Sequence, residues 1–302
     1  MIEVIKVISL VVVVLILLAL IEALSRQLMP TGATVRRELQ QDNRKLAVLY
    51  AGLMGDVDTQ FGAVADWYRT NGYDLLFVKA TGVYCPECVA KSAAQAVEQA
   101  VEMKGYERIV FDGLSLGGRA AVDTQLLLKK WGVRLPHTNL LLEGAPMTYR
   151  SVLGPLKYVS RSIAHIPFGS VLGLLPAGQI LAGAPKPENI EAGADRTFID
   201  ESVAAAKRTS LWRVASELKS FAGRGPYASR SLNQLASRVV FMWFDKDHET
   251  VDQPVALREW QDAVGPQKIQ VVHVNSTHVG IAEAPRANVY AHNWLLGDYH
   301  SY

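Results

Sequence analysis

The segment Val110–Gly118, which reads Val-Phe-Asp-Gly-Leu-Ser-Leu-Gly-Gly, constrains the fold more than any other part of the chain. Its apolar run leads to Ser115, which glycines flank at the Gly-x-Ser-x-Gly spacing. That spacing is typical of a nucleophile elbow, a sharp turn from a strand into a helix at which larger flanking side chains would clash. Arg108–Phe111 has the pattern of a buried strand and Ala120–Lys130 that of an amphipathic helix. The sequence therefore predicts a unit that presents the Ser115 hydroxyl at the edge of a sheet.

Strand patterns alternate with helix patterns over most of the chain. This rhythm predicts a parallel sheet with helices on both faces. It lapses between about Pro146 and Ser237, a gap too long for one loop, so we expect an inserted subdomain, a cap at about 147–236. The first half of the insertion is apolar, and Phe198–Phe221 has the pattern of one or two amphipathic helices. The expected strands cover 46–50, 74–78, 108–111, 138–142, 239–243 and 269–274, and a last helix is expected over 284–296.

The N-terminus has the pattern of a membrane anchor. Val7–Leu24 is an 18-residue segment whose only strongly polar member is Glu22. This is close to the ~20 residues that a helix needs to cross a bilayer, and longer than the apolar part of most cleaved secretory signals, the competing interpretation. Arginines are more frequent after the segment than before it, which places the rest of the chain in the cytoplasm. We therefore expect a single-pass anchor over 1–25, a linker or short surface helix over 26–45, and one domain over 46–298.

Charge and cysteine content exclude several classes of protein. The 302-residue chain has a formal net charge of +2 and no basic block, so it lacks the electrostatic pattern of a nucleic-acid-binding protein. Two cysteines are too few for a disulfide framework or a four-thiolate zinc site. Cys85 and Cys88 stand before an expected helix, where a redox role, an inert thiol pair and a local disulfide all remain open.

A serine hydroxyl becomes a good nucleophile only when a base accepts its proton and a third group orients that base. Of the seven histidines, His278 follows the last expected strand, at the sheet edge where Ser115 would also emerge, so it is the candidate base. His273 lies inside that strand, which favours a structural role. Asp247 follows the preceding strand and is the preferred acid, with Asp245 and then Glu143 as alternatives.

The negative charge that develops on an attacked carbonyl oxygen requires fixed donors, and backbone N–H groups can provide them. One candidate is the N–H of Leu116, at the start of the helix that follows Ser115. The other is the N–H of Leu53, in the loop after the first expected parallel strand, where Gly52 allows the chain to turn.

With these motifs the chain resembles the α/β-hydrolase family over about residues 45–298. The resemblance rests on Gly113–Gly117, the Ala51–Leu53 loop, Asp247 after the penultimate strand and His278 after the last. It implies an α/β-hydrolase fold, with a mostly parallel eight-stranded sheet and a cap inserted after the sixth strand. It also implies catalysis by Ser115, His278 and Asp247 without a metal or an organic cofactor.

A serine at the elbow points to acyl transfer, so the leading hypothesis is a serine hydrolase that cleaves carboxylic esters, lipase-like if the apolar cap receives acyl chains from a membrane. The expected partners are a small-molecule or lipid ester and the membrane, with no nucleic acid. Three alternatives remain open. One is a catalytically silent, membrane-tethered binding protein of the same fold, and another is a thioesterase or peptidase variant. The third is a redox-regulated hydrolase in which Cys85 and Cys88 gate access to the site.

Overall fold

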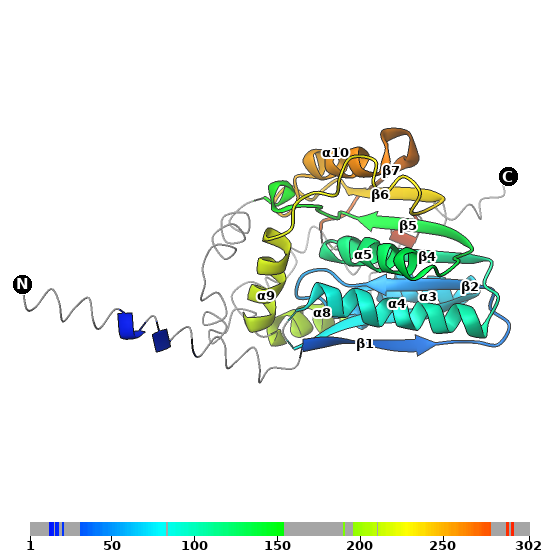
Figure 1. Cartoon of the computed structure of the whole chain (residues 1–302), viewed down its shortest axis with the longest axis horizontal. Coiled ribbons are helices and arrows are strands. Elements are labelled where there is room, and N and C mark those ends of the chain that lie inside the picture. The colour runs from blue at the N-terminus through cyan, green and yellow to red at the C-terminus, as the bar shows by residue number, and fades with distance from the viewer. Residues whose placement is uncertain are drawn as a thin grey trace, which may run out of the picture.

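The computed structural model contains a seven-stranded sheet with helices on both faces (Figure 1). It describes residues 12–14, 16, 17, 20, 31–82, 84–153, 190, 196–209, 211–278, 288, 289, 291 and 292. All neighbouring strands are parallel except the pair β1·β3 at one edge, which is antiparallel. In spatial order the strands are β1 (Thr31–Glu38), β3 (Tyr73–Gly82), β2 (Lys45–Tyr50), β4 (Arg108–Leu114), β5 (His137–Glu143), β6 (Arg238–Phe244) and β7 (Ile269–Val274). The six parallel-sheet strands predicted from the sequence are confirmed.

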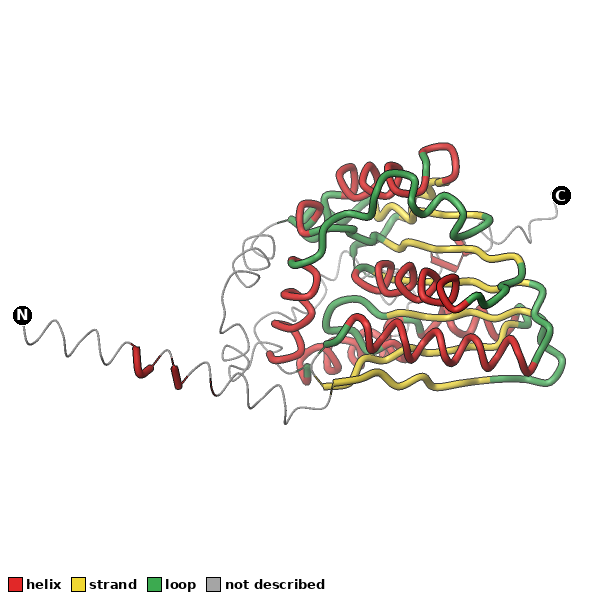
Figure 2. Tube along the Cα trace, viewed as in Figure 1, coloured by secondary structure: helices red, strands yellow, loops and turns green. Residues whose placement is uncertain are grey.

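The central strands bury side chains on both faces of the sheet, which explains why their sequences are continuous apolar runs. In β2, Leu46, Val48 and Tyr50 enter one core, while Ala47 and Leu49 enter the other. The helices α4 (Pro86–Met103), α5 (Leu116–Trp131) and α10 (Gln253–Val264) pack on the first face, and α3 (Gly62–Thr70) packs on the second (Figures 1 and 2).

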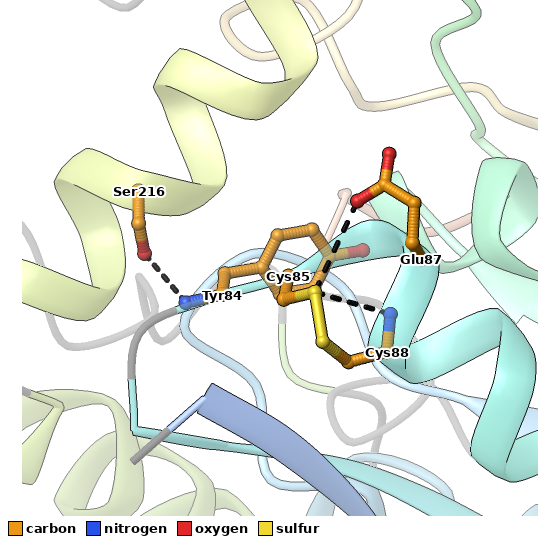
Figure 3. Close-up of a disulfide and its surroundings, with 5 residues drawn as sticks. All are labelled: Tyr84, Cys85, Glu87, Cys88 and Ser216. Atoms are coloured by element: carbon orange, nitrogen blue, oxygen red, sulfur yellow. Dashed lines mark hydrogen bonds between the residues drawn. A yellow bond between two sulfur atoms is a disulfide. The ribbon is translucent and has the colours of Figure 1, made fainter. Parts of the chain in front are cut away.

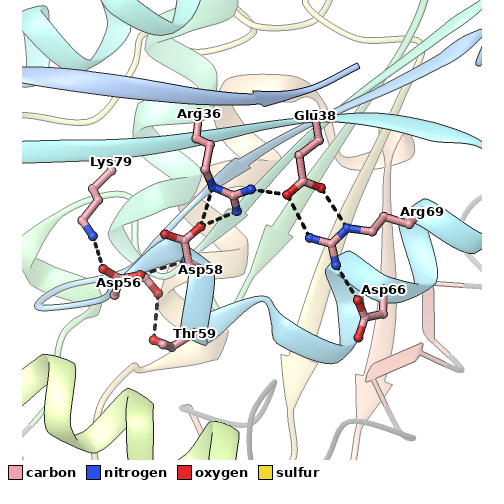
Figure 4. Close-up of polar contacts among 8 residues, drawn as sticks. All are labelled: Arg36, Glu38, Asp56, Asp58, Thr59, Asp66, Arg69 and Lys79. Carbon is pink, nitrogen blue, oxygen red and sulfur yellow. Dashed lines mark hydrogen bonds and ion pairs between the residues drawn. The ribbon is translucent and has the colours of Figure 1, made fainter. Parts of the chain in front are cut away.

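The expected linker over 26–45 is wrong in part, because Thr31–Glu38 forms the edge strand β1. Its register places Val35 opposite Val78 of β3. Charged side chains also join β1 to neighbouring elements: Arg36 bonds Asp58, and Glu38 accepts from Arg69 at 2.8 Å (Figure 4). The polarity that suggested a linker therefore belongs to an edge strand, which can expose one face and one row of backbone groups to water. With β1 included, the described residues contain seven strands rather than the eight that the resemblance implies.

The order of the strands creates a site for chemistry at one end of the sheet. From β2 the chain first adds β3 on one side, then crosses to β4 on the other and continues outward to β7. The loops after β2 and β4 consequently leave the sheet in opposite directions at a topological switch point. In open α/β sheets, ligands bind in the crevice outside the carboxyl ends of the strands at such a point.

Parts of the expected insertion and anchor lie outside the described residues. The second half of the insertion forms α8 (Arg196–Arg208) and α9 (Leu211–Ala222), as its amphipathic pattern predicted, whereas its apolar first half falls mainly within 154–189. The expected last helix is represented by residues 288, 289, 291 and 292, which are helical. Most of the expected span at 7–24 is likewise outside the described residues, and among those described no helix has the length and hydropathy to cross a bilayer. The anchor is therefore not supported by the structure and stays a prediction.

Candidate active site

Ser115 lies at a strained turn between β4 and α5. Its backbone has φ 53° and ψ −123°, a conformation that non-glycine residues rarely adopt. The turn is tight enough to exclude side chains on both sides. A Cβ on Gly113 would lie 2.4 Å from the Gly118 nitrogen, and one on Gly117 would lie 2.2 Å from the Tyr50 carbonyl oxygen. The glycines of the motif are therefore required by close backbone approach, and the strained turn holds the Ser115 hydroxyl at the carboxyl end of β4.

Three side chains from separate loops form one hydrogen-bonded series at this edge. Ser115 Oγ lies 2.8 Å from His278 Nε2, and His278 Nδ1 lies 2.8 Å from Asp247 Oδ2. The second Asp247 oxygen accepts from the Thr250 N–H at 3.0 Å. With Asp247 ionised, Nδ1–H donates to it, which leaves Nε2 free to accept the Ser115 hydroxyl proton. This is the geometry that nucleophile, base and orienting acid need.

Burial and hydrogen bonding act in opposite directions on Asp247. Its side chain is 1% exposed, and burial by itself would raise the pKa of the carboxyl. The hydrogen bond and charge of His278, with the N–H groups of Thr250 and Val251, outweigh burial and lower the pKa below its usual range. Asp247 is therefore held as a carboxylate, the form that orients an imidazole.

The structure also assigns a partner to the alternative acid. Asp245 Oδ1 lies 2.8 Å from Nδ1 of His273, whose ring lies beside that of Trp243 at a centroid distance of 5.5 Å. The side chains of Asp245 and His273 are 43% and 60% exposed, so this pair is on the surface. Asp245 and Asp247 thus contact different histidines, and of the two only Asp247 contacts His278.

The two expected oxyanion donors lie beside Ser115. Leu116 is the first residue of α5, and Leu53 is in the loop after β2. A Cβ on Gly52 would lie 2.9 Å from Ser115 Cβ, so that loop packs directly on the serine. Neither the Leu53 N–H nor the Leu116 N–H donates a hydrogen bond to another described residue. Both are free to donate to a substrate oxygen.

A pocket opens at the same edge. Its lining includes Gly52 and Leu116, which neighbour the serine turn, and the apolar side chains of Val78 and Ala80 of β3. Tyr84, Arg213 and Glu217 also line it, the last two from α9. The inserted region thus contributes directly to the walls of the site.

The cysteine motif forms a disulfide rather than a pair of free thiols. Cys85 and Cys88 are joined at the start of α4, and the preceding residue, Tyr84, donates its backbone N–H to Ser216 Oγ of α9 at 2.7 Å (Figure 3). Of the three readings that the sequence left open, the local disulfide is the one observed. It lies next to the pocket because Tyr84 is a pocket residue.

A second histidine–carboxylate cluster was missed from the sequence. Asp112 of β4, Glu143 of β5 and His292 are completely buried behind Ser115. His292 Nε2 lies 3.1 Å from Asp112 Oδ2 and 3.2 Å from Glu143 Oε1, and Tyr68 donates to Asp112 at 2.9 Å. Glu143, the third choice for the acid, therefore pairs with His292 and not with His278. The sequence feature that could have indicated this cluster is Asp112, an aspartate inside an otherwise apolar strand.

Asp112, Glu143 and His292 are also the described residues that could hold a metal ion. The ligand atoms of Asp112, Glu143 and His292 lie within 4.8 Å of one another, which would suit a cation. Bound protons are another way to balance the charge of this cluster. Burial, together with nearby Asp112, raises the pKa of Glu143 to about 8. Burial opposes the charge on His292, but hydrogen bonds to Asp112 and Glu143 raise its pKa to about 10. Glu143 and His292 are therefore the members of this cluster that hold protons near neutral pH.

Comparisons with known proteins identify the fold. No protein-family model and no curated protein sequence matches the chain. Among solved structures it is similar to a lipase-esterase related protein from Clostridium acetobutylicum, with 11% identity, a TM-score of 0.62 and coverage of 87% of this chain and 99% of that one. It is also similar to an enol-lactonase from Burkholderia xenovorans, with 16% identity, a TM-score of 0.60 and coverage of 88% and 96%. A putative non-heme bromoperoxidase from Mycobacterium tuberculosis has 16% identity, a TM-score of 0.59 and coverage of 89% and 96%. The chain has the α/β-hydrolase fold.

Proposed function

We propose that this protein is a serine hydrolase that cleaves carboxylic esters through an acyl-enzyme. The observation that carries the proposal is the continuous series Ser115 Oγ, His278 and Asp247, with 2.8 Å at each step, at the switch point of the sheet. The names of several structural neighbours, such as aryl esterase and enol-lactonase, concern ester or lactone bonds and support the same class of reaction.

In the proposed reaction, Ser115 Oγ attacks the ester carbonyl carbon while His278 Nε2 accepts the hydroxyl proton. The C=O electron pair moves to the oxygen, which accepts hydrogen bonds from the N–H groups of Leu53 and Leu116. The tetrahedral intermediate then collapses, the ester C–O bond breaks, and His278 returns the proton to the leaving alcohol. A water molecule repeats these steps on the acyl-enzyme and releases the carboxylic acid.

The pocket beside Leu116 has a volume of about 20 Å³, room for about one water molecule, so the acyl and alcohol groups of an ester would lie mainly outside it. The backbone donors of Leu53 and Leu116 suit the ester carbonyl. The lipase-like version of the hypothesis depended on the apolar half of the insertion, which is outside the described residues. A series of p-nitrophenyl esters of increasing acyl chain length, assayed in detergent, separates a lipase from an esterase of short-chain esters. Turnover of the acetate ester alone excludes a lipase.

Covalent labelling tests the function directly. Wild-type protein is expected to react with a fluorophosphonate probe and to hydrolyse p-nitrophenyl acetate, whereas Ser115→Ala is expected to do neither. Ser229→Ala, which changes an exposed serine, is the control and should behave as wild type. Folded wild-type protein that neither labels nor turns over the ester would instead favour the silent binding protein.

We also propose that residues 7–24 anchor the protein in a membrane, with the hydrolase domain in the cytoplasm. The apolar sequence supports the anchor and the distribution of arginines supports the orientation, whereas the Cys85–Cys88 disulfide is of a kind more common in oxidising compartments. Full-length protein should remain in the membrane pellet after extraction at alkaline pH and should resist protease added to intact cells. Release into the soluble fraction contradicts the anchor, and cleavage from outside contradicts its orientation.

A further inference from the structure

The loop after β2, Ala51–Gly55, is held by two buried side chains that reach it from different elements. The Gly52 N–H donates to Gln60 Oε1 at 3.0 Å, and the Met54 N–H donates to Glu217 Oε2 at 3.0 Å. Gln60 ends the short helix α2 (Val57–Gln60), whereas Glu217 lies on α9, 163 residues from Met54. The Leu53 N–H lies between these two and donates to no other described residue. Fixing both neighbouring peptide groups fixes the direction of the free one.

The backbone of this loop needs such support. Met54 has φ 57°, in the left-handed region that costs an L-residue with a side chain about 1 kcal/mol or more. Residues keep such conformations only when surrounding contacts determine them. Here α9 provides those contacts. Val214 and Leu218 pack against Leu53 and Met54, and Thr209, just before α9, donates its hydroxyl to the Met54 carbonyl at 3.3 Å.

Burying the carboxyl group of Glu217 at this position costs free energy. It is 2% exposed, and burial raises the pKa of its carboxyl. Arg213, one turn earlier on α9, donates to its other oxygen at 2.7 Å and also bonds the carbonyl of Ala80. An apolar residue would fill the same space at lower cost. The carboxylate accepts two hydrogen bonds that an apolar residue could not, one from Arg213 and one from the Met54 N–H, and only the second acts on the loop after β2.

We propose that Glu217 is a positioning residue, which orients the Leu53 N–H toward the oxyanion by fixing the adjacent Met54 peptide group. This inference rests on the proposed hydrolase function. It makes α9, part of the inserted region, a determinant of the chemical step in addition to its role as a wall of the pocket. Gln60 has the equivalent role for the Gly52 peptide group on the other side.

Two substitutions separate the reach of the acceptor from its charge. Glu217→Gln removes the charge but keeps an oxygen at the same distance, so kcat for p-nitrophenyl acetate should stay within about fivefold of wild type. Glu217→Asp keeps the charge but draws the oxygens back by one methylene, so kcat should fall about 10- to 100-fold, since complete loss of one oxyanion donor costs about 10²–10³. KM should change less than threefold in both. If the ion pair with Arg213 were the important contact, the order of the two variants would be reversed.

The control is Glu201→Gln, which changes an exposed glutamate of α8 in the same insertion and should leave kcat unchanged. All rates are expressed per active site titrated with fluorophosphonate, so loss of folded protein does not count as loss of kcat. A boronic acid that mimics the tetrahedral intermediate should bind Glu217→Asp more weakly, by the same factor as the fall in kcat/KM.

The outcomes distinguish this inference from the function on which it rests. If wild type labels at Ser115 but Glu217→Asp has wild-type kcat and boronic acid affinity, the positioning role is wrong and the hydrolase remains. If Glu217→Gln loses activity while Glu217→Asp keeps it, the positioning role is also wrong. Folded wild type that does not label overturns both proposals.

Discussion

The molecule contains two histidine–carboxylate groups close to the end of β4, and they differ in what the second ring nitrogen contacts. His278 gives Nδ1 to Asp247 and Nε2 to the Ser115 hydroxyl. In His292, Nδ1 lies 2.7 Å from the backbone carbonyl of Asn288, and Nε2 lies beside the carboxyl groups of Asp112 and Glu143. The first ring can therefore accept a proton from a neighbour and return it. The second already bonds a backbone carbonyl and two buried carboxyl groups, and it has no hydroxyl partner within the described part of the chain.

Access to solvent adds to this difference. The His278 side chain is 12% exposed at the pocket end of the sheet, whereas His292 is fully buried. The two groups are nevertheless linked through the backbone, because the Ser115 N–H donates to the Glu143 carbonyl at 2.8 Å. Residue composition alone thus does not separate a reactive histidine from a structural one. The contacts of both nitrogens do, and the exposed pair Asp245–His273 supplies a third, matched case.

Replacing the histidines in turn should produce the largest difference between the groups. His278→Ala should lower kcat for p-nitrophenyl acetate about 10⁴-fold or more, since a base that acts together with its nucleophile costs nearly the whole triad when removed. His273→Ala should leave kcat unchanged, although its ring also lies 2.8 Å from an aspartate. Steady-state kinetics on both variants make the comparison, and equal activities would break it.

The aspartates should repeat the pattern at a smaller scale. Asp247→Asn removes the acceptor that selects the tautomer of His278, and kcat should fall about 10³- to 10⁴-fold with the fold retained. Asp245→Asn should have no effect on turnover. If Asp245→Asn lost activity and Asp247→Asn did not, Asp245 would be the acid.

His292→Leu should lower the stability of the fold, and its main effect should not be on turnover. Removing the cation leaves Asp112 buried without its charged partner, and breaking a buried pair costs about 3–5 kcal/mol in the free energy of unfolding. His273→Leu breaks an exposed pair, worth about 0–1 kcal/mol. Urea denaturation of the two variants measures both values. If His292→Leu unfolds at the wild-type midpoint, the buried group does not hold the charge assigned to it.

The smallest expected effect is a dependence of stability on pH. The folded-state pKa values of Glu143 and His292 are raised, to about 8 and about 10, above the values near 4.3 and 6.5 of unfolded chains. Folded protein therefore holds more protons, so this contribution to stability is complete at acid pH and is lost as pH rises through these values. Glu143→Gln, which cannot ionise, should lose less stability than wild type between pH 6 and 9. The free energy of unfolding of both proteins is measured by urea denaturation across that range. If it falls equally steeply with pH in wild type and Glu143→Gln, a protonated Glu143 is contradicted.

Much of the fold follows from local sequence pattern. Six strands were predicted because each is an apolar run bounded by turn residues, and β1 was missed because an edge strand can be polar. For the site, chain order and strand ends indicated the loops that carry Ser115, Asp247 and His278. Pattern could favour Asp247 over Asp245 but could not decide between them, since both lie in one short loop.

The sequence by itself determined the elbow at Ser115, because only glycines permit the backbone contacts around that turn. It also determined the parallel rhythm that brings the ends of β4, β6 and β7 to one edge. Only the tertiary structure decided that Asp247 contacts His278, that His292 lies beside Asp112 and Glu143, and that Glu217 bonds the Met54 N–H. The physical reason is range. Turns and strands depend on neighbouring residues, whereas hydrogen bonds between residues 31, 180 and 163 positions apart depend on how the whole chain packs.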